Sequence, residues 1–549
     1  MGSVCETAKP HTQRTFFEVQ KEEPSNQRNI VQDSKTSVKL EFSIENIENN
    51  QRYKIEVSFD NYNKFQTEEV TSHGNIIIFN GCYICDYFFE KQQTLLVSLY
   101  KNSQVVGQMP ITLGHIVGSP GSSLKITICE PTNLIISAES INNKSYVEVD
   151  FVVDNINNVD FSDNSNKFSY LITSNGKKVY ESESIPWNGK FEKAKILEAL
   201  IKNGFTVTFK DSKKKIINSR DDTVERFCTP SNGLYLNLNN NGKIFNIFNK
   251  SQLIRNYSFI DYIKNGVTIK LTIAIDYTSS NKTPNDPLSL HYLGGNMNDY
   301  EQAIKSCGMI VGYYDYNQMF PVYGFGAIIN GQQNANMCFN VNFQQNPEIY
   351  TIDNVIKEYR NSFNNLILAG PTEFCPIVKK AIENIKKEND PLKYHILLIL
   401  TDGIIYDKQD TIDALVEGSF LPLSVIIIGI GNDHFQEMIE LDGDDKPITN
   451  SRGVKRKRDL VQFVPYNDYK YNPTALTEQV LEEVPRQIID FYTMNGIYPE
   501  NLKMAKTAPQ SMPFPNNSSF FGNGGGQQFQ PNFNNNGYVS PQNNIYGQY

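Results

Sequence analysis

The sequence of 549 residues lacks any apolar run close to the roughly 20 residues that a membrane-spanning helix needs. Its N-terminus also lacks the charged and then apolar pattern of a secretory signal peptide. With 39% hydrophobic and 20% charged residues, the composition is typical of folded domains rather than of disordered or membrane chains. We therefore expect a cytoplasmic protein whose length divides into about two to four domains.

Signals for zinc or nucleic-acid binding are scarce as well. The eight cysteines include one C-x-x-C pair, Cys82 and Cys85, and no second pair completes a zinc site. Tyr83 and Ile84 between them are typical of a strand, which favours ordinary buried thiols. The six histidines are dispersed, and the net charge of −9 argues against nucleic acid as a partner.

One basic run, Lys455 to Arg458, has two interpretations. Four consecutive cations could act as a nuclear signal. The run lies directly before a predicted strand, DLVQFV, and that position favours a surface loop.

Two β-rich sections make up the first half of the chain. Over residues 36–140, runs such as SVKLEF, NIIIFN and TLLVSLY alternate with Asn, Gly and Ser turns, which predicts an all-β sandwich. A second set, including YVEVDFVV, FTVTF and KIFNIF, predicts another sandwich over residues 141–254. Residues 1–35 are polar and aperiodic, and they predict a flexible N-terminal arm.

The pattern changes after residue 254. Strongly apolar runs at 267–275, 394–400 and 421–430 suit strands that are covered on both faces. Helical patterns such as DNVIKEYRNSF lie between them, so residues 255–500 predict a doubly wound α/β domain. We expect it to close with a helix around 476–492. Residues 501–549 have no charge after Lys506 and are rich in Asn, Gly, Gln and Pro, which predicts a disordered tail.

The stretch LTIAIDYTSSN contains a candidate cation site. Asp276 ends an apolar run and is followed by Thr278 and Ser280, although the same residue types could cap a helix. Asp402 ends the next such run, and Thr372 lies in a loop before a helix. Ligands of open α/β sheets bind beyond the carboxyl ends of the strands, where these side chains can converge. Their oxygen atoms suit Mg²⁺, Mn²⁺ or alternatively Ca²⁺ better than zinc or copper.

This arrangement resembles the metal-ion-dependent adhesion site of von Willebrand factor A domains, in which D-x-[ST]-x-S is joined by a distant Thr and Asp. The surrounding sequence is similar to one family, the copines, over residues 255–490. The similar stretches are RNYSFIDYIKNG, PLSLHYL, FPVYGFGA, LAGPTEF, LLILTDG, LPLSVIIIGIGNDHF, ELDGDD and RDLVQFVPY. In the first sandwich, CDYFFEKQQTLLVSLY also resembles that family.

The resemblance implies a multidomain protein: two all-β C2 sandwiches, then a doubly wound α/β domain of the von Willebrand A type. It implies that the metal residues are Asp276, Thr278, Ser280, Thr372 and Asp402. It also implies a phospholipid-binding adaptor without enzymatic activity. Such an adaptor docks on anionic membranes through its C2 domains and uses Mg²⁺ or Mn²⁺ to bind an acidic residue of a partner protein.

C2 domains bind calcium through loop aspartates, and here this chain departs from the family pattern. In the first sandwich, Lys101–Ser103 replaces the expected Asp-x-Asp pair, so we expect no calcium binding of the usual kind. In the second sandwich, Asp160, Asp163 and Asp211 are candidate Ca²⁺ ligands, and Asn166 stands where another aspartate is expected. Because ligand charge controls calcium affinity, we expect a weakened calcium dependence.

Two other features could bring the chain to a membrane. Lys213–Lys215 form a basic loop, and each cation near anionic lipid contributes about 1 kcal/mol, although an ordinary solvated loop has the same composition. Gly2 and Cys5 could accept a myristoyl and a palmitoyl group, but Glu6 stands where the myristoylation pattern has Ser or Thr. Either feature predicts peripheral association with the plasma or internal membranes.

An enzyme is the alternative class of function. A strand that ends in Asp276, together with LILTDG around Asp402, is also similar to haloacid-dehalogenase phosphatases. Those enzymes need Asp-x-Asp, and Thr278 stands at the second position, where an acid/base carboxylate is required. The sequence also has no phosphate-binding G-x-x-x-x-G-K-[ST] pattern. The adaptor is therefore the favoured hypothesis, and a hydrolase that uses Asp276 and Asp402 is the alternative.

Overall fold

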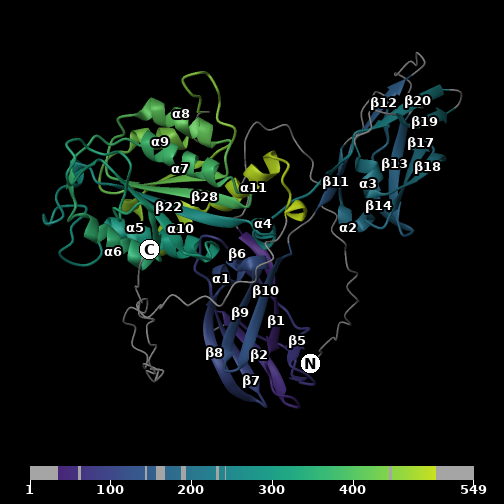
Figure 1. The fold of residues 1–549 in the computed structure, drawn as a ribbon. Coiled ribbons are helices and arrows are strands. Elements are labelled where there is room, and N and C mark those ends of the chain that lie inside the picture. Colours follow the sequence, from purple (N-terminus) through teal and green to yellow (C-terminus); the bar gives the residue numbers. More distant parts are fainter. Residues whose placement is uncertain are drawn as a thin grey trace, which may run out of the picture. The chain divides into compact units, whose positions relative to one another are not determined.

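The computed structural model describes residues 35–59, 63–141, 145–155, 167–186, 193–229, 234–240, 243–443 and 448–502. Residues 1–34 of the predicted arm and residues 503–549 of the predicted tail, with Gly2, Cys5, Asp160 and Asp163, lie outside the described residues. The predicted fold class, two β sandwiches followed by a doubly wound α/β domain, is confirmed (Figure 1). None of the described helices is both long and apolar enough to span a bilayer.

The first sandwich has two antiparallel sheets, with strand orders β5-β1-β10-β9 and β3-β2-β7-β8. In its first strand Val38, Leu40 and Phe42 are buried, because alternate side chains of a strand point to the same face. The elements are β1 Lys35–Glu45, β2 Arg52–Phe59, β3 Asn63–Gln66, β4 Val70–Thr71, β5 Ile76–Ile78, β6 Tyr83–Phe88, β7 Thr94–Lys101, β8 Gln104–Thr112, α1 Leu113–Gly118, β9 Ser123–Cys129 and β10 Thr132–Ser140.

The second sandwich has strand orders β16-β11-β21, β12-β20-β19 and β14-β13-β17-β18. Aromatic rings fill its core: Phe151 packs edge-on against Tyr170 at 5.1 Å and Phe209 at 5.5 Å between ring centroids. The elements are β11 Tyr146–Val149, β12 Phe151–Asn155, β13 Lys167–Ser174, β14 Lys177–Glu181, β15 Ile185–Pro186, β16 Ala194–Leu197, α2 Glu198–Ile201, β17 Phe205–Asp211, β18 Ile216–Asp222, α3 Val224–Cys228, β19 Leu234–Asn240, β20 Lys243–Asn249 and β21 Gln252–Ile254.

The α/β domain is built on a sheet of order β25-β23-β22-β28-β29-β30, in which β23, β22, β28, β29 and β30 are parallel. Figure 1 shows α7, α8 and α9 on one face of the sheet and α5, α6 and α10 on the other. The elements are α4 Phe259–Lys264, β22 Thr268–Asp276, α5 Asp299–Val311, β23 Met319–Phe325, β24 Ala327–Ile329, β25 Phe339–Asn340, β26 Glu348–Tyr350, α6 Ile352–Ser362, β27 Leu366–Leu368, α7 Cys375–Glu388, β28 Lys393–Thr401, α8 Lys408–Gly418, β29 Leu423–Gly429, α9 Gln436–Asp442, β30 Val461–Pro465, α10 Pro473–Leu481 and α11 Val484–Met494.

The single closing helix expected around 476–492 was wrong, because two helices, α10 and α11, occupy this segment. Pro485 lies in the first turn of α11. Proline is accepted at a helix start, but inside a helix it removes a hydrogen bond and clashes with the preceding turn. The chain therefore ends one helix at Leu481 and begins another.

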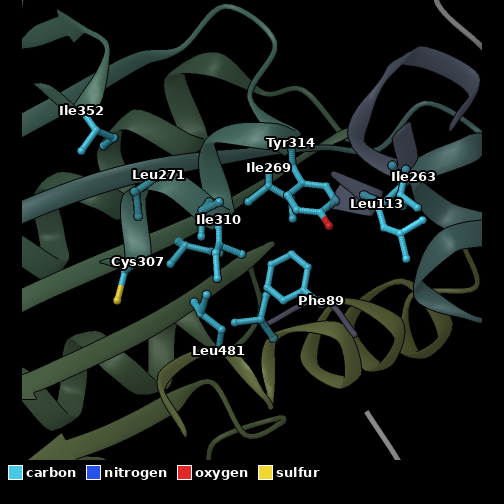
Figure 2. Close-up of a cluster of buried hydrophobic side chains, with 14 of the residues drawn as sticks. Phe89, Leu113, Ile263, Ile269, Leu271, Cys307, Ile310, Tyr314, Ile352 and Leu481 are labelled. Carbon is cyan, nitrogen blue, oxygen red and sulfur yellow. The ribbon is translucent and has the colours of Figure 1, made fainter. Parts of the chain in front are cut away.

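The first sandwich and the α/β domain contribute to one cluster of buried side chains (Figure 2). The ring of Phe89 lies 5.1 Å from that of Phe259 and 4.9 Å from that of Tyr314. The buried hydroxyls of Tyr87 and Tyr314 form a hydrogen bond. Large aromatic side chains of this kind bury much apolar area, so this contact stabilises both parts.

Candidate metal centre

The ends of two neighbouring strands bring the acidic residues together. Strands β22 and β28 are parallel, with Ile275 opposite Leu400, so the last residues of both strands lie side by side. The hydroxyl of Thr401 donates to Asp276 Oδ2 at 2.6 Å. The other oxygen of Asp276 accepts from the backbone N–H of Thr278 at 2.8 Å. Both oxygens of this fully buried carboxylate are thus held in place.

Two hydroxyl side chains join Asp276 to the second acid. The oxygens of Thr278 and Ser280 lie 2.9 Å apart. Ser280 donates to Asp402 Oδ1 at 3.0 Å, and Thr278 lies 3.5 Å from the same oxygen. Four of the five residues expected from the sequence therefore form one connected group.

Thr372, the fifth expected residue, comes from the loop between β27 and α7. It runs beside the loop that follows β22, and a parallel bridge joins Thr278 of that loop to Ala369. A Cβ added to Gly403 would lie 3.7 Å from the hydroxyl of Thr372 and 3.9 Å from that of Ser280. Both hydroxyls therefore border the same small space, which a side chain at position 403 would fill.

Two further residues shape these loops. Gly326 has φ of +78°, and a Cβ there would collide with Cγ2 of Thr278, so this position needs glycine. The carboxylate of Asp407 accepts from the backbone N–H groups of Phe374 at 3.0 Å and Cys375 at 2.7 Å. Asp407 thereby connects the loop that follows Asp402 to the start of α7. This helix begins directly after the loop that contains Thr372.

The electrostatics of the group favour a cation. Burial raises the pKa of Asp402 to about 7, and the neighbouring charge of Asp276 adds to the shift. Burial also raises the pKa of Asp276, against the hydrogen bonds from Thr278 and Thr401. Neither carboxylate forms an ion pair with Lys, Arg or His in the described part of the chain. A buried and a half-buried acid without a cationic partner are costly unless a metal or protons neutralise them.

The donor atoms fit a hard divalent cation. The side chains supply carboxylate and hydroxyl oxygens, as Mg²⁺ and Mn²⁺ prefer. Across the described residues there is no cluster of three or more His, Cys, Asp or Glu side chains that could hold a softer metal. With only two carboxylates, such a cation would keep coordination positions for water or for an external oxygen ligand.

Several residues that support this group carry no recognisable signal in the sequence. Asn281 donates to the hydroxyl oxygen of Thr278 at 3.4 Å and to its carbonyl at 3.3 Å. His291 is fully buried and lies 2.9 Å from the carbonyl oxygen of Asp276. Burial lowers the pKa of His291 to about 3, so its ring is neutral. Neither residue belongs to the D-x-[ST]-x-S spacing, and a lone histidine is usually a core residue.

Two glutamates of the first sandwich are paired with lysines. The strands β7 and β8 are joined by a tight hairpin in which Lys101 is opposite Gln104, where the family pattern has an Asp-x-Asp pair. Lys101 pairs with Glu48 at 2.7 Å, and Lys125 pairs with Glu45 at 2.5 Å. Glu45 ends β1, and Glu48 lies in the loop between β1 and β2.

In the second sandwich, Asp211 stabilises its own turn. Its Oδ1 accepts from the backbone N–H groups of Lys213 at 2.9 Å and Lys215 at 2.8 Å, and Lys214 has φ of +62°. Asp222, which lies opposite Phe205 at the other end of β17, is buried and pairs with Arg226 at 2.5 Å. The structure therefore does not bring a set of unpaired carboxylates around Asp211 within the residues it describes.

The basic loop itself is open to solvent. Lys213, Lys214 and Lys215 are exposed and form no ion pair with any described residue. Ile216, which follows them, is 59% exposed. This hairpin tip therefore presents three cations next to an apolar side chain.

The other basic run is partly structural. Arg458 is 5% exposed and donates to the carbonyl oxygen of Leu421 at 2.8 Å. Arg456 pairs with Asp459 at 3.0 Å. Lys455 and Lys457 remain exposed. The segment is a loop before β30, and two of its four cations are used to hold that loop.

Comparison with known proteins finds matches in both the β and the α/β parts of the chain. The copine family model matches residues 289–500. Among solved structures, the calcium-bound tandem C2 domains of extended synaptotagmin 2 match with 9% identity and a TM-score of 0.18, covering 40% of this chain and 97% of that one.

Two structures match the α/β part. Manganese-loaded TRAP protein of Plasmodium vivax matches with 12% identity and a TM-score of 0.25, covering 41% of this chain and 74% of that one. A von Willebrand factor type A protein of Catenulispora acidiphila matches with 15% identity and a TM-score of 0.26, covering 43% of this chain and 44% of that one. Thr372 and Asp402 lie inside the family match, whereas Asp276, Thr278 and Ser280 directly precede it. Residues 289–500 of this chain are thus similar to the copine domain.

Proposed function

We propose that this chain is a copine-type adaptor that docks on anionic phospholipid membranes and binds partner proteins through a divalent cation in its α/β domain. Asp276, Thr278, Ser280, Thr372 and Asp402 would hold Mg²⁺ or Mn²⁺. When bound, the cation would supply an electrophilic centre that an acidic side chain of the partner completes. The protein would act at the membrane surface as a peripheral component.

The observation that carries this proposal is the pair of acids Asp276, which is fully buried, and Asp402, which is half-buried. The hydroxyls of Thr278 and Ser280 lie beside Asp402 without a basic residue from the described part of the chain, and burial, followed by the charge of Asp276, raises the pKa of Asp402. A purely structural acid pair would be expected to carry a lysine or arginine partner, as Asp222 does with Arg226. A bound cation would remove the repulsion between the two carboxylates. Its incomplete ligand shell would suit a position at this edge of the sheet, where solvent or a partner can supply the remaining ligands.

The metal part of the proposal is tested by titrating the full chain with Mn²⁺ and following the free-ion signal by electron paramagnetic resonance. We expect one site that Mg²⁺ competes for and that Asp402→Asn removes. Undiminished binding by this variant would overturn the assignment. A peptide that carries an aspartate should then bind in Mg²⁺ and not in chelator.

Membrane docking is proposed to depend mainly on the exposed lysines at 213–215, with Ile216 beside them for contact with the lipid interior. Co-sedimentation with vesicles that contain phosphatidylserine, in calcium and in chelator, tests this. Binding that is similar in both conditions and falls as salt rises supports the basic loop. Binding that requires calcium would instead assign the role to Asp160, Asp163 and Asp211, and absence of binding would leave acylation at Gly2 or Cys5.

We propose that the site has no hydrolytic activity. The phosphatase alternative needs a carboxylate at position 278, and the residue there is a threonine whose hydroxyl contacts Ser280. Phosphatase assays with Mg²⁺ should give the same background for the wild type and for Asp276→Asn. Turnover that disappears in this variant would overturn the proposal.

A further inference from the structure

A network of buried and half-buried polar side chains lies behind the candidate metal centre and connects it to α5 and α6. His291 uses both ring nitrogens: Nε2 lies 2.9 Å from the carbonyl oxygen of Asp276, and Nδ1 lies 2.7 Å from the hydroxyl of Tyr359. A carbonyl oxygen can only accept a hydrogen bond, so Nε2 carries the proton. Nδ1 is then an acceptor, and the hydroxyl of Tyr359 donates to it.

The network continues to the start of α5. The amide of Asn298 donates to the hydroxyl oxygen of Tyr359 at 3.1 Å. The side-chain oxygen of Asn298 accepts from the backbone N–H of Glu301 at 3.0 Å and thereby caps α5. Arg360, which follows Tyr359 on α6, donates to the buried carboxylate of Glu301 at 2.8 Å. Each hydrogen bond of this network thus has a defined donor and acceptor. The end of the network away from Asp276 is held by α5 and α6.

A second connection runs from α5 to the neighbouring turn. The hydroxyl of Tyr300 donates to the side-chain oxygen of Asn281 at 2.8 Å. The amide of Asn281 in turn donates to the carbonyl and hydroxyl oxygens of Thr278. The strand end at Asp276 and the turn at Thr278 are therefore both held from α5 and α6, on the side away from the solvent.

The bond from His291 has a particular importance because Asp276 is the last residue of β22. A buried carbonyl oxygen without a donor is destabilising, and rotation of this peptide group would also turn the carboxylate that precedes it. Residues that orient metal ligands from behind typically change metal affinity by about 10- to 100-fold when they are altered.

We propose that His291 and Tyr359 are positioning residues for the cation: they hold the main chain at Asp276 so that its carboxylate and the hydroxyls of Thr278 and Ser280 face one point. This inference rests on the proposed metal site. Neither residue touches the cation. Their role is to maintain the ligand geometry before the metal arrives, which reduces the ordering that binding requires.

The test uses Tyr359→Phe, which removes one hydroxyl and keeps the ring. Its matched control is Tyr394→Phe: Tyr394 is also fully buried in the α/β domain, and its hydroxyl bonds to Ser424 at 2.9 Å near the opposite end of β28. Both variants lose one buried hydroxyl, but only the first loss lies in the network behind the metal centre. We expect Mn²⁺ to bind about tenfold more weakly to Tyr359→Phe and with unchanged affinity to Tyr394→Phe.

A second measurement uses the chain without metal. The backbone N–H of Thr278 is bonded to Asp276, so loss of the positioning contact should speed its hydrogen exchange in chelator. We expect faster exchange at this amide in Tyr359→Phe than in Tyr394→Phe, with similar melting temperatures for the two variants. His291→Gln, which keeps an N–H donor, should retain more Mn²⁺ affinity than His291→Leu, which has none.

The outcomes separate this inference from the proposed function. If the wild type binds Mn²⁺ through Asp402 and the two Tyr→Phe variants bind it equally well, the positioning role is wrong and the metal site stands. If the wild type does not bind Mn²⁺, the metal site itself is wrong, and this inference falls with it. If Tyr359→Phe and Tyr394→Phe lose the same affinity for Mn²⁺, the hydroxyl of Tyr359 contributes only to the stability of the folded domain, and the positioning role is wrong.

Discussion

The two acids of the candidate metal centre and several acids of the two sandwiches have opposite surroundings. In the α/β domain, Asp276 and Asp402 converge without a cation from the protein. In the sandwiches, Glu48 pairs with Lys101, and Asp222 pairs with Arg226. Asp211 is occupied by the N–H groups of its own turn. The proposal of a cation site therefore depends on which acids the fold leaves without a basic partner, and not on the number of acids.

The largest expected effect comes from removing one of the unneutralised charges. Asp402→Asn should weaken Mn²⁺ binding at least ~100-fold, because the site then has a single carboxylate. In chelator the same variant should melt at a higher temperature than the wild type, because a buried repulsion is gone.

Mn²⁺ titration and thermal unfolding measure both effects. Asp353→Asn, at an exposed position on α6, is the control and should change neither. A lower melting temperature for Asp402→Asn in chelator would mean that this acid is a structural partner, and it would break the comparison between the two regions.

The next effect concerns the cations of the second sandwich. Replacing Lys213, Lys214 and Lys215 together by Ala should weaken binding to phosphatidylserine vesicles at low salt. At about 1 kcal/mol for each lysine, the upper limit is roughly 150-fold, and the loss should shrink as salt rises.

The control for this triple variant removes the same charge elsewhere: Lys357, Lys386 and Lys387 are exposed on α6 and α7. Co-sedimentation should distinguish the two triple variants clearly at low salt. If both lose the same affinity, net charge alone drives binding, and the hairpin tip has no special role.

A smaller effect comes from a histidine outside the metal centre. His395 is 7% exposed, and burial, followed by the charges of Lys393 and Lys270, lowers its pKa from 6.5 to about 3. The unfolded chain binds a proton below about pH 6.5, whereas the folded chain does not, so this residue makes stability fall as pH falls. At pH 5 the cost is about 2 kcal/mol.

His395→Gln stays neutral at every pH, so the variant isolates this contribution. The melting temperature of the wild type minus that of His395→Gln should decrease as pH is lowered from 7 to 5. If the difference in melting temperature is constant over this range, His395 is protonated in the folded protein as well. Its Nε2 would then form an ion pair with Oε2 of Glu388, which lies 3.4 Å away.

The smallest expected effect is that of Asp211→Asn. An asparagine oxygen can accept the same N–H bonds from Lys213 and Lys215, so the turn should persist. We expect less than a threefold change in vesicle binding, both with calcium and with chelator. A calcium response that disappears in this variant would show that Asp211 is a ligand and would remove the contrast with the metal centre.

Much of the candidate centre follows from local sequence. The apolar runs before Asp276 and Asp402 predict buried parallel strands, and the carboxyl ends of such strands share one edge of the sheet. The side-chain types at 276, 278 and 280 then indicate an oxygen site. The division of the closing segment into α10 and α11 was also within reach, since Pro485 is visible in the sequence.

Other parts of the centre depend on contacts between distant positions. His291 and Tyr359 are 68 positions apart, and Thr401 and Asp276 are 125 apart. No spacing rule connects such pairs, because their proximity results from how α6 and β28 pack beside β22. A buried histidine or tyrosine looks like an ordinary core residue until its partners are known.

The order of the β and α/β parts, the all-oxygen character of the candidate centre and the basic tip of the second sandwich can be predicted from the sequence alone. These follow from periodicity and side-chain chemistry, which are local properties. The three-dimensional arrangement is needed to see which acids stay without a basic partner and which polar groups hold the loops of the candidate centre from behind. Both depend on burial and on pairing between distant segments, and the energy of a charge depends on its surroundings more than on its neighbours in the chain.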